Sequence, residues 1–266
     1  MIPNVLTIAG SDPSGGAGIQ ADLKTFSALG GYGMSVLTGL TAQNTRGVVG
    51  VHPVPAEFVT RQLDAVFDDI RVDSVKIGML ATAEVVAAVA GVLAVRRPRF
   101  IVLDPVMVAK SGDRLLLADA VASLREVLLP LVDVVTPNLP EAADLLGEPE
   151  ATDEATMATQ AKALAALGPA VLLKGGHLGG AESPDLLLEP DATAPVRLTA
   201  QRIATTSDHG TGCTLSSAIA ALRPRHDNLL DTVRAAKEYL TGALAAAGRL
   251  EVGHGHGPVH HFHAWW

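Results

Sequence analysis

The string HGTGCTLSSAIAAL at His209–Leu222 places two glycines directly before an Ala/Leu-rich helical segment. Thr211 and Thr214 are residue types that cap such a helix. Backbone N–H groups and the positive end of the helix dipole converge at such a start, which suits a phosphate or another oxyanion. The spacing alone is explained equally well by a glycine-eased helix start with a buried Cys213.

Two charged residues stand directly after apolar runs. Asp104 follows Phe100–Leu103, and Lys174 follows Val171–Leu173 and precedes two glycines. Burying an unpaired carboxylate costs several kcal/mol, which favours a functional role for Asp104. A lysine ammonium acts as a point charge that suits phosphate, so Lys174 is a candidate phosphate ligand.

The segment Asn138-Leu-Pro-Glu141 matches a helix capping box, with Asn138 as the N-cap and Glu141 three residues later. That structural role needs no function and is the favoured interpretation. A carboxylate at a helix start that follows a strand is also well placed to bind Mg²⁺ through water.

A second glycine-rich segment, GSDPSGGAG at Gly10–Gly18, follows the first apolar run. Its glycines do not match the dinucleotide fingerprint, and no Gly-Lys-Ser/Thr follows to make a nucleotide P-loop. A loop for phosphate or a polar substrate and a plain strand–helix turn both remain open. Asp22, one turn into the next helical segment, is either a surface acid at the positive helix end or a ligand contact.

The C-terminal string GHGHGPVHHFHAWW is rich in imidazoles, which can bind metals. Their spacing matches no helical pair with a carboxylate, so packing of the tail with Trp265 and Trp266 as anchors is favoured over a metal site. Five of the nine histidines of the chain lie there: His254, His256, His260, His261 and His263.

Short aliphatic runs alternate with helical patterns along the chain. The runs are continuous rather than alternating, as expected of strands covered on both faces: Val5–Ala9, Ser35–Leu40, Ser74–Ile77, Phe100–Leu103, Val132–Thr136 and Val171–Leu173. The helical patterns are Ile19–Leu29, Pro55–Ile70, Ala83–Val95, Ala118–Leu128, Asp153–Leu167, Thr214–Leu222 and Asn228–Leu250. This rhythm predicts an α/β fold with a mostly parallel sheet, and without a linker or repeat we expect one domain over residues 1–266.

In the predicted sheet, the polar motifs lie at the same edge. Ligands of open α/β sheets bind at the carboxyl ends of the strands. Five predicted strands are followed there by polar or glycine-rich groups, at Gly10–Gly18, Gln43–Asn44, Asp104, Pro137–Asn138 and Lys174–Gly176. The sequence therefore predicts one site at this edge of the sheet.

Composition restricts the class of protein. The 266 residues are 48% hydrophobic with a net charge of −8, which argues against a nucleic-acid or anionic-membrane partner. The single cysteine excludes an intramolecular disulfide and a cysteine metal cage. No basic residue precedes Lys24, and the longest apolar stretch, Val85–Val95, falls well short of the ~20 residues that span a bilayer. We expect a reduced, cytoplasmic setting.

Nine strings spread in order along the whole chain together resemble one family. They are GSDPSGGAGIQADLKTFSALG, TAQNT, KIGML, LDPVM, AKSGD, TPNLPEA, LLKGGH, HGTGCTLSSAIAA and GPVHHFH. They resemble the hydroxymethylpyrimidine/phosphomethylpyrimidine kinases of thiamine biosynthesis, in the ribokinase-like superfamily. The resemblance implies a three-layer α/β/α sandwich, two successive ATP-dependent phosphorylations of 4-amino-5-hydroxymethyl-2-methylpyrimidine, Mg²⁺ as cofactor and a homodimer.

The resemblance also implies roles for residues at matching positions. The aminopyrimidine would lie near Gly10, Asp22, Gln43, Met79 and Val106. Mg²⁺ and the phosphate waters would lie near Asp104, Asn138 and Glu141. Lys174 would contact the ATP phosphates, and the anion hole with its preceding residue would comprise His209, Gly210, Thr211 and Gly212.

The resemblance further implies that Cys213 is the base for the first phosphorylation, where most ribokinase relatives have Asp. A thiol at a helix N-terminus can have its pKa lowered from ~8.5 toward 3.5–7.5, so we expect a thiolate there. One departure concerns Ser207-Asp208, where the family often has Asn-Thr, because a carboxylate near triphosphate is unfavourable unless it faces away or binds a cation.

Three alternatives accompany this interpretation. A pyridoxal or pyridoxine kinase shares the fold and also acts on a ring hydroxymethyl group. A non-catalytic pyrimidine-binding protein would use the same pocket, but Asp104, Lys174 and Cys213 argue for catalysis. A cysteine hydrolase or acyl-transferase is disfavoured, because no Cys–His–Asp/Asn order is evident.

Overall fold

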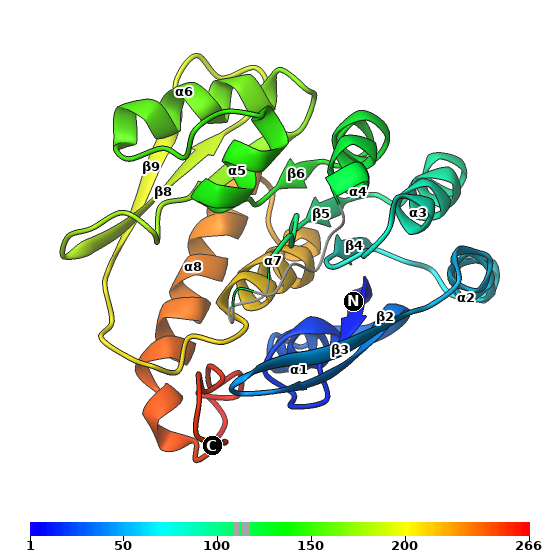
Figure 1. The fold of residues 1–266 in the computed structure, drawn as a ribbon, viewed down its shortest axis with the longest axis horizontal. Coiled ribbons are helices and arrows are strands. Elements are labelled where there is room, and N and C mark those ends of the chain that lie inside the picture. The colour runs from blue at the N-terminus through cyan, green and yellow to red at the C-terminus, as the bar shows by residue number, and fades with distance from the viewer. Residues whose placement is uncertain (109–111, 113–117) are drawn as a thin grey trace.

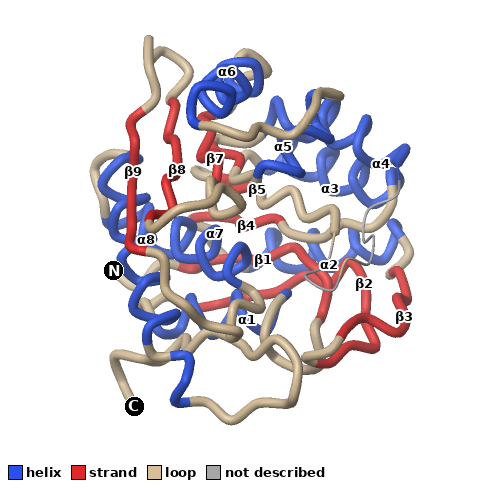
Figure 2. The backbone as a smooth tube through the Cα atoms, turned by 60° about the vertical axis from the view of Figure 1, so that its left-hand side comes forward, coloured by secondary structure: helices blue, strands red, loops and turns tan. Residues whose placement is uncertain are grey.

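The computed structural model describes residues 1–108, 112 and 118–266, and most of the AKSGD string at 109–113 lies outside that part. Its strands form one nine-stranded sheet in the order β3-β2-β1-β4-β5-β6-β7-β8-β9 (Figures 1 and 2). The strands are β1 (Asn4–Ser11), β2 (Tyr32–Asn44), β3 (Gly47–Pro53), β4 (Ser74–Ile77), β5 (Ile101–Leu103), β6 (Val134–Val135), β7 (Ala170–Lys174), β8 (Glu182–Leu188) and β9 (Val196–Gln201).

The centre of the sheet is parallel and its edges are antiparallel. Strands β2, β1, β4, β5, β6 and β7 pair in parallel. These are the six strands predicted from continuous aliphatic runs. Strands β3, β8 and β9 add antiparallel edges that the sequence did not predict.

Helices cover both faces of the sheet (Figure 1). They are α1 (Gly18–Ala28), α2 (Ala56–Asp69), α3 (Ala83–Arg96), α4 (Ala118–Ser123), α5 (Leu139–Leu146), α6 (Glu154–Ala165), α7 (Thr211–Leu222) and α8 (Leu229–Ala245). Leu6 and Ile8 of β1 pack in a core with α2, α3, α5 and α6. Val5 faces the opposite way and packs in a second core with α1, α7 and α8. The fold is therefore the predicted three-layer α/β/α sandwich with a ribokinase-like architecture.

Most helices agree with their predicted ranges, and two starts are informative. Helix α5 begins with the predicted capping box, since Asn138 Oδ1 accepts from Glu141 N at 2.9 Å and Glu141 Oε2 accepts from Asn138 N at 2.8 Å. Helix α7 begins at Thr211, three residues before the predicted start, and Gly210 is its N-cap without any side-chain cap. The prediction that threonines cap it was wrong, because Thr214 Oγ1 instead donates back to Gly210 O within the helix.

The C-terminal tail packs through its histidines more than through its tryptophans. His260 and His261 are buried, whereas Trp265 and Trp266 are 68% and 64% exposed. The expectation that the tryptophans anchor the tail holds only in part, because Trp265 Nε1 donates to Ala28 O of α1 at 3.2 Å while both rings remain largely exposed. No three His, Cys, Asp or Glu residues of the described chain form a metal-binding group. Within the same ranges, no helix is both long and apolar enough to span a membrane.

Candidate active site

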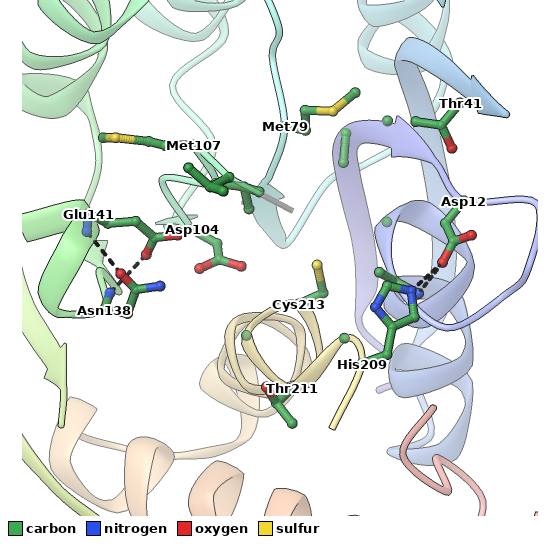
Figure 3. Close-up of a pocket in the computed structure, with 18 of the residues that line it drawn as sticks. Asp12, Thr41, Met79, Asp104, Met107, Asn138, Glu141, His209, Thr211 and Cys213 are labelled. Carbon is green, nitrogen blue, oxygen red and sulfur yellow. Dashed lines mark hydrogen bonds and ion pairs between the residues drawn. The ribbon is translucent and has the colours of Figure 1, made fainter. Parts of the chain in front are cut away.

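A cavity of about 450 Å³ opens at the carboxyl ends of the parallel strands. Segments that follow β1, β4, β5, β6 and β7 line it together with the start of α7. Figure 3 shows Cys213 between Asp104 on one side and the Asp12–His209 pair on the other. The structure thus brings the motifs after separate strands into one site.

The start of α7 forms one wall of this cavity. Gly210, Thr211, Gly212 and Cys213 all line it. Gly210 has φ +79°, and a Cβ there would lie 1.9 Å from Gly16 O, so only glycine fits. The first N–H groups of a helix have no intrahelical acceptor and carry the positive end of the dipole. This wall can therefore bind an oxyanion.

A charged cluster lies against the helix start, where a Cβ on Gly212 would be 3.4 Å from both Asp104 Oδ2 and Lys174 Nζ. Lys174 Nζ lies 3.0 Å from Asp104 Oδ1 and 3.9 Å from Glu141 Oε2. Asp104 is buried and also accepts from Thr136 Oγ1 at 3.3 Å, so the carboxylate is not unpaired. Burial lowers the pKa of Lys174, but the two carboxylates outweigh burial and raise it above its ordinary value. The lysine therefore carries a full positive charge in the cavity.

The same cluster can hold a divalent cation. Asp104, Glu141 and Asn138 all line the cavity and offer the hard oxygen donors that Mg²⁺ prefers. Burial and the neighbouring Asp104 charge raise the pKa of Glu141 to about 7, against the opposing effect of Lys174. Because two carboxylates do not make a closed cage, the donor set fits an ion shared with substrate phosphates and water.

The other side of the cavity is apolar with a few polar groups. Gly10, Gln43, Met79 and Val106, which the resemblance assigned to the aminopyrimidine, line this side. A Cβ on Gly10 would lie 2.3 Å from Met79 Cε, so the methionine covers the glycine directly. Gln43 Nε2 lies 3.4 Å from His209 Nε2. A flat ring with polar edges would fit between these groups.

Asp22 is neither a surface acid nor a residue that lines the cavity. Its side chain is fully buried and is absent from the cavity wall. Thr7 Oγ1 and Ser217 Oγ donate to it at 2.6 and 2.7 Å, and Lys76 Nζ lies 2.9 Å from both of its oxygens. Both sequence-based interpretations of Asp22 therefore need correction, because its carboxylate is already occupied beneath the site.

Two charged residues that line the cavity, Asp12 and Lys76, were given no role from the sequence. Asp12 Oδ2 lies 2.8 Å from His209 Nε2 and accepts from Ala17 N at 2.8 Å, which ties the glycine-rich loop to the start of α7. Lys76 lies inside β4 and lines the cavity. A charged residue within a buried aliphatic run could have marked it as a functional residue in the sequence. Asp208, which the sequence had already singled out beside Ser207, also lines the cavity, and its Oδ1 lies 2.9 Å from His256 Nδ1.

Comparison with known proteins shows the family of this chain. The family model described as phosphomethylpyrimidine kinase matches residues 12–260. The chain belongs to the phosphomethylpyrimidine kinase family. It is 61% identical over 264 residues to the hydroxymethylpyrimidine/phosphomethylpyrimidine kinase of Escherichia coli K12, covering 99% of this chain and 98% of that protein. The chain is therefore a kinase.

Solved structures of related kinases have the same fold. A phosphomethylpyrimidine kinase from Clostridium difficile 630 matches with a TM-score of 0.79 and 42% identity, over 91% of this chain and 99% of that one. An ADP complex of Bacillus subtilis pyridoxal kinase matches with a TM-score of 0.88 and 36% identity, over 98% of both chains.

The protonation of Cys213 in this kinase differs from the expectation. Burial raises the pKa of the thiol to about 11, and the Lys76 charge only partly opposes this effect. The sequence-based expectation counted the helix dipole but had no measure of burial. In the free kinase the thiol form therefore dominates at neutral pH.

Proposed function

We propose that this kinase transfers the γ-phosphoryl group of ATP to 4-amino-5-hydroxymethyl-2-methylpyrimidine and then to the resulting monophosphate, in thiamine biosynthesis. The observation that carries the proposal is the 61% identity to the hydroxymethylpyrimidine/phosphomethylpyrimidine kinase of Escherichia coli K12, which extends over nearly the whole of that protein. The cavity supports it, because the helix start, Lys174 and Asp104 surround the same space as Gln43 and Met79.

The first transfer follows from positioning and charge. The hydroxymethyl oxygen attacks the γ-phosphorus, the new O–P bond forms, and the bond to ADP breaks. Lys174 and the N–H groups at the start of α7 stabilise the negative charge on the transferring group. Bound Mg²⁺, held by Asp104, Glu141 and Asn138, would supply further neutralisation of the phosphates. The hydroxyl proton passes to Cys213 in its thiolate form, which is the minor form in the free kinase.

The second transfer has a different requirement. The nucleophile is then a phosphate oxygen that already carries negative charge, so no base is needed. The same groups would still stabilise the transferring phosphoryl group. Cys213 therefore acts in the first step only.

The aminopyrimidine would be recognised by the cavity side that holds Gln43. A side-chain amide donates and accepts, which matches the edge of an aminopyrimidine ring. Met79 and Val106 provide apolar contact for the ring. Asp208 lies at the same cavity, and its contact with His256 Nδ1 at 2.9 Å orients the carboxylate.

We also propose a homodimer. Strands β2 and β3 form an antiparallel ribbon at the edge of the sheet (Figure 1). Val49 and Val51 on this ribbon are 83% and 41% exposed. A second copy of the chain would cover such an apolar edge.

Pyridoxal phosphorylation is the second candidate activity, favoured by the TM-score of 0.88 to a pyridoxal kinase. A coupled assay of ADP release with hydroxymethylpyrimidine, its monophosphate and pyridoxal separates the candidates. We expect turnover of both pyrimidines. Turnover of pyridoxal alone would favour the pyridoxal kinase activity over the proposed one. If none of the three compounds caused ADP release, the protein would be a non-catalytic pyrimidine-binding protein.

A further inference from the structure

Lys76 is a charged residue in a fully buried strand, where an apolar residue is expected. It lies in β4, a central strand paired in parallel with β1 and β5, and all four β4 residues are buried. Val75 and Ile77 point into the core with α2 and α3, so Lys76 points to the face covered by α1 and α7. A Cβ on Gly78 would lie 2.9 Å from Lys76 Nζ, which places the ammonium toward the carboxyl end of the strand. The side chain thus reaches the floor of the cavity, which it lines.

A single carboxylate fixes this ammonium. Lys76 Nζ lies 2.9 Å from both oxygens of Asp22, and both side chains are fully buried. Thr7 and Ser217 donate to the same two oxygens. The cluster therefore joins β1, β4, α1 and α7 beneath the site, and the lysine has little freedom to move.

Fold stability alone does not explain such a pair. A buried ion pair must overcome a large desolvation cost, and apolar residues of similar volume often stabilise a core as well or better. Ser74, on the same face of β4, contacts α7 through a simple hydrogen bond to Ala220 O at 2.7 Å. A positive charge at Lys76 therefore calls for a role in the cavity above it.

Cys213 lines the same cavity as Lys76. Four charged groups act on the thiol from separate elements: Lys76 from β4, Asp22 from α1, Asp104 after β5 and Lys174 from β7. Both aspartates disfavour the thiolate, and Lys76 is the strongest of the influences that favour it. Ser217 lies one turn after Cys213 on α7, so the Asp22 contact also fixes the helix that carries the thiol.

We propose that Lys76 is a positioning residue for the first phosphoryl transfer: its buried ammonium, held by Asp22, supplies the positive charge that favours the Cys213 thiolate. This inference rests on the proposed function for the role of Cys213 as a base. The thiolate takes the hydroxyl proton as the O–P bond forms and the bond to ADP breaks. Lys76 neither gains nor loses a proton in this step.

The first test needs no substrate. Cys213 is the only cysteine of the chain, so alkylation of the full-length protein by iodoacetamide reports on that thiol alone. In Lys76→Met we expect the alkylation rate at pH 8 to fall about tenfold and the pH–rate profile to move up by about one unit. Lys76→Arg keeps the charge and should stay within about threefold of the wild type. Ser74→Ala is the matched control on the same strand face and should keep the wild-type profile.

Lys76→Met leaves the Asp22 carboxylate buried without its lysine partner, so poor folding of this variant is a risk. A second variant keeps the test decisive in that case. Lys76→Met with Asp22→Asn removes both charges and keeps an amide for Thr7 and Ser217. We expect the same direction of change, but smaller, because the effect of Lys76 on the thiol exceeds that of Asp22. Wild-type alkylation profiles in both variants would overturn the inference.

The kinase assay then separates this inference from the proposed function. In the variants, the pH profile of kcat/KM should shift to higher pH when hydroxymethylpyrimidine is the substrate. It should stay unchanged when the monophosphate is the substrate. Equal losses for both substrates at every pH would assign Lys76 a purely structural role and overturn the inference. Absence of any pyrimidine turnover by the wild type would refute the proposed function, while the alkylation result would still decide the effect of Lys76 on the thiol.

Discussion

Two buried lysines reach the cavity, and their surroundings give them different roles. Lys76 faces one carboxylate at 2.9 Å, whereas Lys174 lies 3.0 Å from Asp104 and 3.9 Å from Glu141. Lys76 is fully buried, while Lys174 ends its strand at the cavity mouth with a side chain that is 15% exposed. Lys174 can therefore contact a phosphate directly, whereas the proposed role of Lys76 is an electrostatic effect on the Cys213 thiol.

Removing the thiol tests the proposed base. In Cys213→Ala we expect the first phosphorylation to fall by about 10²–10⁴, the usual contribution of general-base catalysis. The second should change by less than about threefold, because its nucleophile is already an anion. Initial rates with hydroxymethylpyrimidine and with its monophosphate measure the two steps. Similar losses in both would leave Cys213 as a packing residue of the anion-binding wall.

Removing the Lys174 charge tests the proposed phosphate contact. Lys174→Met should slow both phosphorylations by about 10²–10³, since the lost interaction stabilises the transferring group in each. Lys162→Met, a change at an exposed lysine of α6, is the matched control and should leave both rates unchanged. A variant that lost only one of the two activities would contradict the assignment of Lys174 to the transferring phosphoryl group.

At single residues, the sequence located groups that end strands better than groups inside them. Asp104 and Lys174 were found because polar residues after apolar runs lie at the ligand-binding edge of such a sheet. Lys76 was missed because its partner Asp22 lies 54 residues away and only the fold brings them together. The pKa of Cys213 was wrongly expected to be low because burial cannot be counted before packing is known.

At the scale of elements, the start of α7 depends on a left-handed glycine. Gly210 has φ +79°, and a Cβ would lie 1.9 Å from Gly16 O. We expect Gly210→Ala to shift the glycine-rich loop or the helix start, to cost at least about 1 kcal/mol of unfolding free energy and to impair both phosphorylations. Chemical denaturation and the two rate assays measure these effects.

Gly91→Ala is the control for that substitution. Gly91 is an exposed residue of α3 with nothing within 4 Å of a new Cβ. The change should stabilise the protein by about 0.5–1 kcal/mol and leave both activities intact. A Gly210→Ala variant with unchanged rates would show that the geometry of this helix start is dispensable.

Two of the three strands that escaped prediction, β3 and β9, lie at the edges of the sheet and are largely exposed, whereas β8 is buried over its second half and was missed although it ends in Leu186–Leu188. Strand β3 is mostly exposed, and β9 alternates weakly between buried and exposed residues. Edge strands need no continuous aliphatic run because one side or face meets solvent. The six parallel strands were all predicted, and they are the strands that position the site.

At the scale of the whole molecule, the C-terminal tail joins segments far apart in the sequence. His256 N donates to Thr45 O at 2.8 Å, next to the β2–β3 turn, and His209 N donates to Gly257 O at 3.0 Å, next to the start of α7 (Figure 1). His260 N donates to Ala243 O in α8. The tail thus supports the anion-binding wall from outside the cavity.

His261 fixes the tail to α7 and makes that attachment sensitive to acid. Thr214 Oγ1 donates to Gly210 O, so its contact with His261 Nε2 at 3.1 Å requires the neutral ring to donate from Nε2. Burial, together with the charges of Lys24 and His260, lowers the pKa of His261 to about 3. Its pKa in the unfolded chain is about 6.5, so between these values only the unfolded state binds the proton.

This difference predicts how the kinase loses stability in acid. The contribution of His261 is fully present above pH 6.5 and decreases as the pH falls toward 3, by about 2 kcal/mol at pH 5. His261→Gln keeps an N–H donor and removes the titration, so its unfolding free energy should fall less between pH 7 and pH 5. Urea denaturation at both values measures this, with His254→Gln at an exposed position as the control. Equal losses in the wild type and His261→Gln would mean that the ring is protonated in the folded protein and that the tail attachment does not depend on its neutrality.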